Sequence, residues 1–130
     1  MPSFLINFAG SALVATTFAL QVQAGQVDPF APTMRTEVID GLSIAYREAG
    51  DPANPAVVLL HGFPTSSHMF RNLIPALADA YYVIAPDYPG YGASDMPDAA
   101  EYEYSFANTA ELMTELLDRK GVGKYTAYVM

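Results

Sequence analysis

The stretch VVLLHGFPTSSHMF, Val57–Phe70, decides the fold, because an apolar run leads into a Gly-Phe-Pro turn and then into helix-capping residues. The apolar run, AVVLL at Ala56–Leu60, has the length of one strand. A strand with no polar face is typical of a parallel sheet that is buried on both sides. Residues 65–67, Thr-Ser-Ser, are of the types that cap a helix N-terminus. The stretch therefore predicts a strand, a sharp turn and a helix in succession.

A hairpin is predicted upstream of this strand. Thr36–Ile39 and Leu42–Arg47 are short runs of strand length. Between them lies Asp40-Gly41, a dipeptide well suited to a two-residue hairpin turn. Two antiparallel strands are therefore expected to open the folded domain.

Helix and strand patterns alternate downstream. Apolar residues recur with helical spacing over Met69–Ala78, and Pro75 interrupts them, so we expect two short helical pieces or a kink. Tyr81–Ala85 is predicted to be a second buried strand, and the final KYTAYVM to begin a third. Ser105–Lys120 has the spacing of an amphipathic helix. Its predicted apolar side consists of Phe106, Ala110, Leu112, Met113, Leu116 and Leu117.

This order of elements predicts an α/β fold, in which an N-terminal antiparallel hairpin is followed by parallel strands with crossover helices. In such folds, ligands bind where loops leave the carboxyl ends of the strands. Two loops qualify here, HGFPTSS after Leu60 and DYPGYGASD after Ala85. We therefore expect the functional site between these two loops.

The first loop contains a candidate functional group in its backbone. Gly62 and Pro64 impose a tight bend, which keeps the N–H of Phe63 from joining a strand ladder. An N–H held in this way can stabilise a developing oxyanion. The alternative is that the segment is only a sharp strand-to-helix turn, and the residues by themselves leave both interpretations open.

Composition excludes several functional classes. The 130 residues suit one domain, and 14 acidic against 6 basic residues give a net charge of -8. No Lys/Arg cluster is present, which argues against nucleic acid as a partner. Cysteine is absent, so thiol catalysis, disulfides and thiolate metal sites are excluded. Because His61, His68 and Asp87 lack the spacing of a metal site, we predict no metal and no cofactor.

The N-terminal segment is largely apolar and carries no charge. It contains Val-Gln-Ala ending at Ala24, which suits signal peptidase, although no basic residue stands near Met1. We predict a signal peptide at 1–24, a linker at 25–34 and a folded domain at 35–130. The mature protein would then be periplasmic or secreted, without stable membrane association. An uncleaved membrane anchor or a buried N-terminal helix is the alternative, and a protein without a signal peptide would be cytoplasmic.

Two near-matches to catalytic motifs do not predict sites. GLSIA, at Gly41–Ala45, approaches the nucleophile elbow Gly-X-Ser-X-Gly, but it lies in the predicted hairpin with no helix after it. PGYGASD, at Pro89–Asp95, approaches a dinucleotide-binding fingerprint, but the third glycine position holds Asp95 and no helix begins there. The tyrosines of this region are interpreted as packing and rim residues: Tyr82, Tyr88, Tyr91, Tyr102 and Tyr104.

The two loops with their flanking segments, VVLLHGFPTSSHMFRNLIPALA and VIAPDYPGYGASD, resemble the N-terminal half of the α/β-hydrolase family. The resemblance extends over Arg35–Met130 and points to the branch of epoxide hydrolases and of haloalkane and haloacetate dehalogenases. It implies that Phe63 supplies one backbone N–H of an oxyanion hole and that the Phe63–Pro64 peptide is cis. It also implies that His61 is not the catalytic base but a structural residue whose ring ties the loop to its neighbour. The other residues expected to shape the two loops are Gly62, Pro64, Asp87, Gly90 and Gly92.

The function implied by this resemblance is hydrolysis of a small apolar epoxide, halide or ester through a covalent ester intermediate, with no cofactor. Haloalkane dehalogenases usually hold a halide-binding Asn where this chain has Phe63, so ordinary haloalkane dehalogenation is the less expected reaction. Haloacetate dehalogenases and epoxide hydrolases often share the Phe, so the choice between these two stays open. In this fold the nucleophile follows the strand that KYTAYVM begins, and the acid and the catalytic histidine come later. We therefore expect the chain alone to be an inactive N-terminal part of a hydrolase. The resemblance also implies that the KYTAYVM strand, interior in the family, is an exposed edge in this chain, with Tyr125, Tyr128 and Val129 beside its unpaired backbone groups.

Two other functions stay open at this point. A serine esterase has the same fold and uses Ser, rather than Asp, as its nucleophile. A non-catalytic module would keep the hydrolase crevice as a ligand-binding pocket. The residue that follows Met130 in a longer protein would separate the three, because it would be Asp, Ser or neither.

Overall fold

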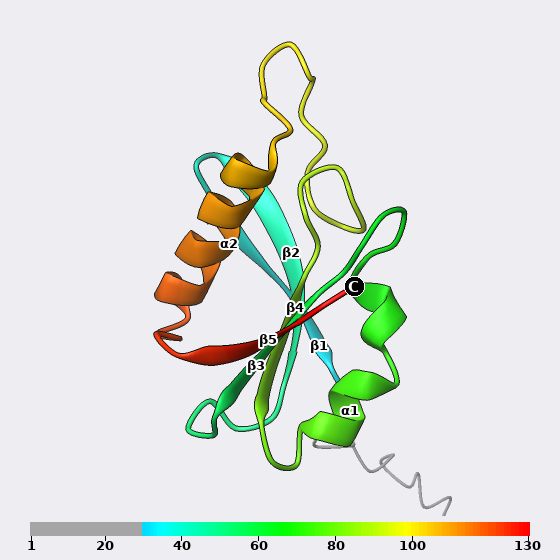
Figure 1. The fold of residues 1–130 in the computed structure, drawn as a ribbon, viewed down its shortest axis with the longest axis vertical. Helices are drawn as coiled ribbons and strands as arrows, with labels where there is room; N and C mark the ends of the chain where they lie inside the picture. Colours follow the sequence, from blue (N-terminus) through cyan, green and yellow to red (C-terminus); the bar gives the residue numbers. More distant parts are fainter. Residues whose placement is uncertain (1–29) are drawn as a thin grey trace, which may run out of the picture.

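The computed structural model describes residues 30–130, which form one mixed sheet with helices on both faces (Figure 1). The predicted signal peptide and the first half of the predicted linker, residues 25–29, lie outside the described residues. The strand order is β1-β2-β4-β3-β5, which confirms the α/β fold with a leading antiparallel hairpin. The elements are β1 (Thr33–Ile39), β2 (Leu42–Ala49), β3 (Ala56–Leu60), the 3-10 helix η1 (Ser67–Phe70), α1 (Leu73–Leu77), β4 (Tyr82–Pro86), α2 (Phe106–Arg119) and β5 (Tyr125–Val129).

The hairpin of β1 and β2 turns at the predicted dipeptide. Asp40 (φ 50°) and Gly41 (φ 82°) both have positive φ, as a type I′ turn requires. β1 begins at Thr33, which pairs with Glu48, so the last two residues of the predicted linker belong to the strand. The first strand therefore starts three residues earlier than the sequence pattern indicates.

The three parallel strands β3, β4 and β5 have their carboxyl ends on the same side of the sheet. β3 pairs in parallel with β4 on one side and with β5 on the other, through Val58↔Ile84 and Val58↔Ala127. β4 also pairs with β2, in the antiparallel direction. The loops that follow β3 and β4 therefore leave from adjacent strands at the same edge (Figure 1).

The helical segment after β3 consists of two short pieces, as its proline predicts. Ser66 caps η1 by accepting a hydrogen bond from the His68 N–H (3.3 Å). α1 contains Pro75, whose nitrogen has no proton to donate to the carbonyl of Arg71, so the two pieces do not merge into one helix. The core beneath them consists of Ala49, Leu59, Phe70, Ile74, Ala78, Val83 and Ala85.

α2 covers the opposite face of the sheet, although not with all of the predicted residues. Ser105 caps the helix by accepting a hydrogen bond from the Asn108 N–H (3.2 Å). The predicted side of the helix is not buried along its whole length, because Phe106 is 98% exposed and Ala110 is exposed as well. Both residues face a groove at the loop edge rather than a strand. The side chains of α2 that reach the core are Leu112, Met113, Leu116 and Leu117.

β5 forms where it was predicted, but its side chains are not buried. Among the described strands it pairs only with β3, and it is one edge of the sheet. All five of its residues are exposed, including Tyr125, Tyr128 and Val129. The expectation that this strand is an exposed edge in the 130-residue chain is therefore confirmed, because burial would require a neighbour on its second side as well.

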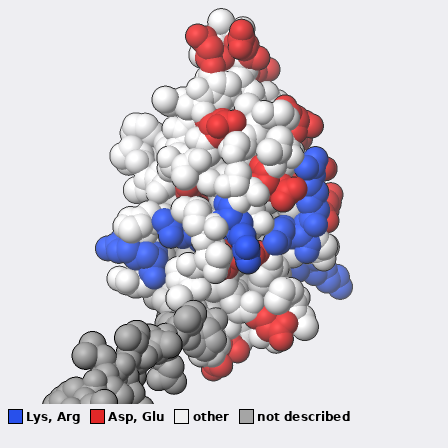
Figure 2. All heavy atoms as spheres, turned by 180° about the vertical axis from the view of Figure 1, so that it is seen from behind, with Lys and Arg blue, Asp and Glu red and all other residues white. Residues whose placement is uncertain are grey.

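Charged side chains of both signs are interspersed on the face turned away from the viewer in Figure 1, which Figure 2 shows. Lys and Arg lie in a belt across the middle of that face, with Asp and Glu beside them. Several basic side chains of the protein are paired, as in the contact between Arg119 and Glu115 (2.7 Å). No helix within residues 30–130 has the length and hydropathy needed to cross a membrane.

A polar network fixes the C-terminal end of α2 to the sheet. Glu48 of β2 contacts Lys120 Nζ (2.8 Å), and it accepts hydrogen bonds from the Tyr82 hydroxyl (2.7 Å) and from Arg35 Nε (3.0 Å). Burial alone would raise the pKa of Glu48, but these partners outweigh it and hold the pKa below its usual value. Burial and the Glu48 carboxylate together raise the pKa of Tyr82 to about 12, so its hydroxyl remains a donor.

Glu48→Gln should lower the free energy of unfolding at pH 7 by about 1–3 kcal/mol, since it leaves Lys120 without its carboxylate. A depressed folded-state pKa stabilises the protein fully above the usual value of 4.5, and that contribution is lost as the pH falls through the folded-state pKa. The difference between Glu48→Gln and wild type should therefore shrink in acid, as measured by urea unfolding across pH. Glu115→Gln, in the exposed pair with Arg119, is the control and should cost about 0.5 kcal/mol or less. Equal losses for both variants would contradict the network.

Candidate functional site

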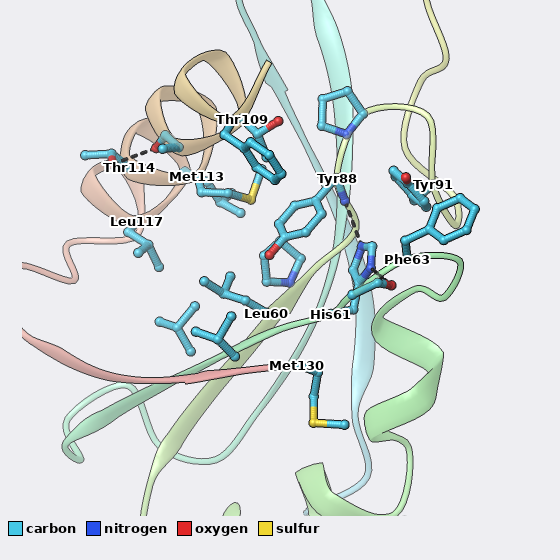
Figure 3. A pocket seen from close by; sticks show the side chains of 18 of the residues that line it. Leu60, His61, Phe63, Tyr88, Tyr91, Thr109, Met113, Thr114, Leu117 and Met130 are labelled. Carbon is cyan, nitrogen blue, oxygen red and sulfur yellow. Dashed lines mark hydrogen bonds between the residues drawn. The ribbon is translucent and has the colours of Figure 1, made fainter. Parts of the chain in front are cut away.

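A groove of about 830 Å³ lies at the edge where β3, β4 and β5 end (Figure 3). Residues of α2, including Met113 and Leu117, form one side, and the loops after β3 and β4 form the other. No Asp, Glu, Lys or Arg lines it among the described residues. The groove is therefore an apolar, partly aromatic site that no Asp, Glu, Lys or Arg side chain of the described residues lines. Its lining at the loop end consists of Leu60, His61, Gly62, Phe63, Pro86, Tyr88, Pro89, Tyr91, Tyr104 and Met130.

The loop after β3 is a tight turn that runs from Gly62 to Thr65, with Phe63 and Pro64 at its centre. The Gly62 carbonyl accepts hydrogen bonds from the N–H (3.0 Å) and the hydroxyl (2.7 Å) of Thr65. The Phe63–Pro64 peptide is cis, as the family resemblance implies. A Cβ at Gly62 would lie 2.7 Å from the carbonyl oxygen of Met130, so a larger residue would collide with the end of β5. The turn is thus held against the neighbouring strand end.

Phe63 lies on this turn at the rim of the groove. Its side chain is 86% exposed, and its ring stands 6.5 Å from that of Tyr91. Among residues 30–130, no group accepts a hydrogen bond from the Phe63 N–H. The backbone donor singled out from the sequence is therefore not engaged in sheet pairing within the described structure.

His61 is buried between the two loops, with both ring nitrogens in contact with the main chain. Nε2 accepts a hydrogen bond from the Tyr88 N–H (3.2 Å), and Nδ1 lies 3.2 Å from the Gly62 carbonyl oxygen. The ring also packs against those of Tyr88 and Tyr91, with centroids 4.3 and 5.3 Å away. No described acidic side chain bonds to the ring. A catalytic base needs a free nitrogen aimed at substrate, and this ring has none.

Asp87, directly after β4, connects the two loops through its side chain. Its buried carboxylate accepts the Ser67 N–H at Oδ1 (2.6 Å) and the Ala93 N–H at Oδ2 (2.9 Å). Ser94 adds a second contact, because its hydroxyl donates to the Asp87 carbonyl (2.7 Å) and accepts the Ala45 N–H (2.8 Å). Sequence reasoning missed the roles of Ser67 and Ser94, whose partners are distant in the chain. The only available signal was a serine next to a glycine-rich turn.

The glycines of the second loop have conformations that suit their type. Gly90 (φ 83°) donates its N–H to the Asp95 carbonyl (2.8 Å). Gly92 (φ 56°) lies against the carboxylate, and a Cβ there would be 2.1 Å from Asp87 Oδ2. The position at 92 therefore has to be glycine both for its backbone angle and for the space that Asp87 occupies.

The two segments that approach catalytic motifs, Gly41–Ala45 and Pro89–Asp95, are joined by hydrogen bonds. The Ser43 N–H donates to Asp95 Oδ2 (2.8 Å), and the Asp95 N–H donates to the Ser43 carbonyl (2.9 Å). Ser43 is a strand residue of β2 with no helix after it, so it does not form a nucleophile elbow. Within residues 30–130, no three metal-ligating side chains are grouped in a way that could hold an ion.

Comparisons of the sequence and of the structure with known proteins agree on one family. Residues 55–129 match the family described as alpha/beta hydrolase fold. The chain is 47% identical to epoxide hydrolase A of Mycobacterium tuberculosis over 92 residues, which covers 70% of this chain and 28% of that protein. It is 38% identical to a haloalkane dehalogenase of Bradyrhizobium diazoefficiens over 94 residues, covering 72% and 29%. The crystal structure of epoxide hydrolase A from Mycobacterium thermoresistibile matches with a TM-score of 0.69 and 39% identity, covering 75% of this chain and 31% of that one. The chain thus spans about a third of the length of the curated relatives it matches.

Gly92→Ala should destabilise the protein more than Gly41→Ala does. Both glycines have positive φ, so each alanine pays a backbone cost of about 1–2 kcal/mol. Only at Gly92 does the added Cβ meet an atom, the Asp87 carboxylate, whereas nothing lies within 4 Å at Gly41. Displacing a buried, hydrogen-bonded carboxylate should cost about 2 kcal/mol more in urea unfolding. Equal losses for the two variants would show that Asp87 can move freely.

Proposed function

Because this chain belongs to the alpha/beta hydrolase fold family, we propose that it forms the oxyanion-binding side of a hydrolase site for a small apolar epoxide, halide or ester. Its relatives include proteins named epoxide hydrolase and haloalkane dehalogenase. The reaction would proceed through a covalent ester between substrate and enzyme, which water then hydrolyses. No cofactor is needed for these steps, and the partner is a small-molecule substrate.

The single observation that carries this proposal is the Phe63 N–H at the rim of the groove, without an acceptor among residues 30–130. Hydrolysis of a covalent ester passes through a tetrahedral species whose former carbonyl oxygen becomes negatively charged. A backbone donor fixed in advance stabilises that oxygen more than it stabilises the ester, and so lowers the barrier. The contacts of Gly62 and Asp87 on either side supply the fixed position.

The groove favours an uncharged substrate. Its lining among the described residues has aromatic rings such as Tyr88, Tyr91 and Tyr104 and no charged side chain. A haloacetate carries a carboxylate, for which this lining offers no cation. Phe63 stands where haloalkane dehalogenases usually have their halide-binding Asn. An epoxide or an ester is therefore the substrate that the site supports best.

We further propose that the nucleophile, the acid and the catalytic histidine come from outside these 130 residues, and that the chain alone is inactive. Within the described residues His61 is occupied by main-chain contacts and Ser43 lies in the hairpin strand β2. A serine esterase and a non-catalytic binding module are the alternatives. An Asp on the turn after β5 in a longer protein supports the epoxide or halide reaction, a Ser supports an esterase, and neither supports a binding module.

Phe63→Pro in the full-length enzyme should lower kcat by about 10²-fold or more, because proline has no N–H to donate to the oxyanion. Phe63→Leu is the matched control, since it changes the same side chain and keeps the donor, and it should retain most of the turnover. Steady-state hydrolysis of an aryl epoxide and of a p-nitrophenyl ester measures both variants. Thermal melts would verify that both remain folded. Unchanged turnover in folded Phe63→Pro protein would refute the oxyanion role.

We also propose that the chain is exported and cut after Ala24. The residues involved lie outside the described structure, and the support is their uncharged, apolar sequence ending in Val-Gln-Ala. Protein recovered from the periplasm or medium should begin at Gly25 in N-terminal sequencing. Recovery of exported protein that still begins at Met1 would refute the cleavage, and confinement to the cytoplasm would refute export.

A further inference from the structure

The two loops at the groove are joined through one imidazole. The Tyr88 N–H donates to His61 Nε2 (3.2 Å), and an amide N–H has no lone pair to accept with. Nε2 must therefore be unprotonated, and the ring proton lies on Nδ1, which faces the Gly62 carbonyl (3.2 Å). We propose that His61 holds the second loop to the first only while its ring is neutral, so that its protonation loosens the wall of the groove.

The groups around the ring provide no replacement for this contact. A proton on Nε2 would place one N–H against another, at Tyr88. The rings of Tyr88 and Tyr91 pack on the imidazole, and burial raises the pKa of Tyr88, so this phenol offers no negative charge. The carboxylate of Asp87 is already bonded to two backbone N–H groups. The main chain of Met130 lies against Gly62 and brings a terminal carboxylate to this region in the 130-residue chain.

The consequence is local to the start of the second loop. Tyr88 would lose the acceptor of its backbone N–H, and a partly buried amide without a partner is costly. Ala93, further along the same loop, would keep its hydrogen bond to Asp87. The loop would therefore loosen at Tyr88 and Tyr91, which line the groove, without detaching from the fold. On the proposed function, turnover would fall in acid together with protonation of His61.

Hydrogen exchange on the 130-residue chain at micromolar concentration tests this between about pH 8 and pH 5, where histidine commonly changes charge. Exchange of the imidazole Cε1–H, read by mass spectrometry, reports protonation of each ring, and amide exchange corrected for its intrinsic pH dependence reports protection at Tyr88 and Ala93. Tyr88 protection should fall at least about 10-fold with the same midpoint as His61 protonation, while Ala93 remains protected. His68, which is exposed, is the internal control. Unchanged Tyr88 protection while His61 protonates, a loss that follows His68 instead, or no protonation of His61 in this range would overturn the proposal.

His61→Gln separates the charge from the contact. A glutamine oxygen can accept the Tyr88 N–H and does not titrate, so this variant should keep Tyr88 protected at both ends of the pH range. His68→Gln should leave the wild-type pH dependence unchanged. The same acid-induced loss in folded His61→Gln would refute the role of the imidazole, and if that variant does not fold, the wild-type midpoints decide. These measurements need no substrate. If Tyr88 protection follows His61 protonation but turnover of the full-length enzyme does not, the result would therefore contradict the proposed function and not the role of His61 in holding the loop.

Discussion

The buried carboxylate of Asp87 is the contact on which the geometry of both loops depends. One oxygen accepts the Ser67 N–H and the other the Ala93 N–H, so one side chain at the end of β4 fixes the start of η1 and the glycine turn next to it. A buried charge that loses its partners is strongly destabilising, and this opposes independent movement of either loop. The same constraint extends to sequence, because Gly92 leaves the space that the carboxylate fills.

The polar network around Glu48 and the apolar groove lie at opposite ends of β4. Tyr82, at its start, belongs to the network around Glu48, whereas Asp87, just past its end, supports the groove. α2 spans the same distance, with Lys120 beyond its C-terminal end in the network and Thr109 near its N-terminus at the groove. The side chains of the ion pairs that fix the helix therefore do not line the groove. The helix that forms one side of the groove is thus held by ion pairs, while no charged side chain of the described residues lines the groove itself.

Features that depend on neighbours in sequence were predictable, and features that depend on the sheet's boundaries were not. The turn at Asp40 and the strand Ala56–Leu60 follow from local residue types, and the structure has both. The Glu48–Lys120 pair joins residues far apart in sequence, and no local pattern indicates it. Phe106 has helical spacing but faces the groove. The period of the apolar residues shows which side of the helix they share, but it does not show whether a strand or a groove faces that side. The exposure of β5 follows from its place at the edge of the described sheet, which the apolar run alone does not reveal and which the family's strand order does imply.

The second loop is held at two points that differ in chemistry. Asp87 accepts the Ala93 N–H with a carboxylate oxygen, and His61 accepts the Tyr88 N–H with a ring nitrogen. Of these two acceptor types, only an imidazole ordinarily becomes a donor between pH 5 and 8. The glycine turn of the loop is thus held at Ala93 by a carboxylate, which remains an acceptor over this pH range. The part that lines the groove is held at Tyr88 by an imidazole, which stops accepting when it is protonated. A site built on the Phe63 N–H could therefore keep its fold while its wall responds to acidity.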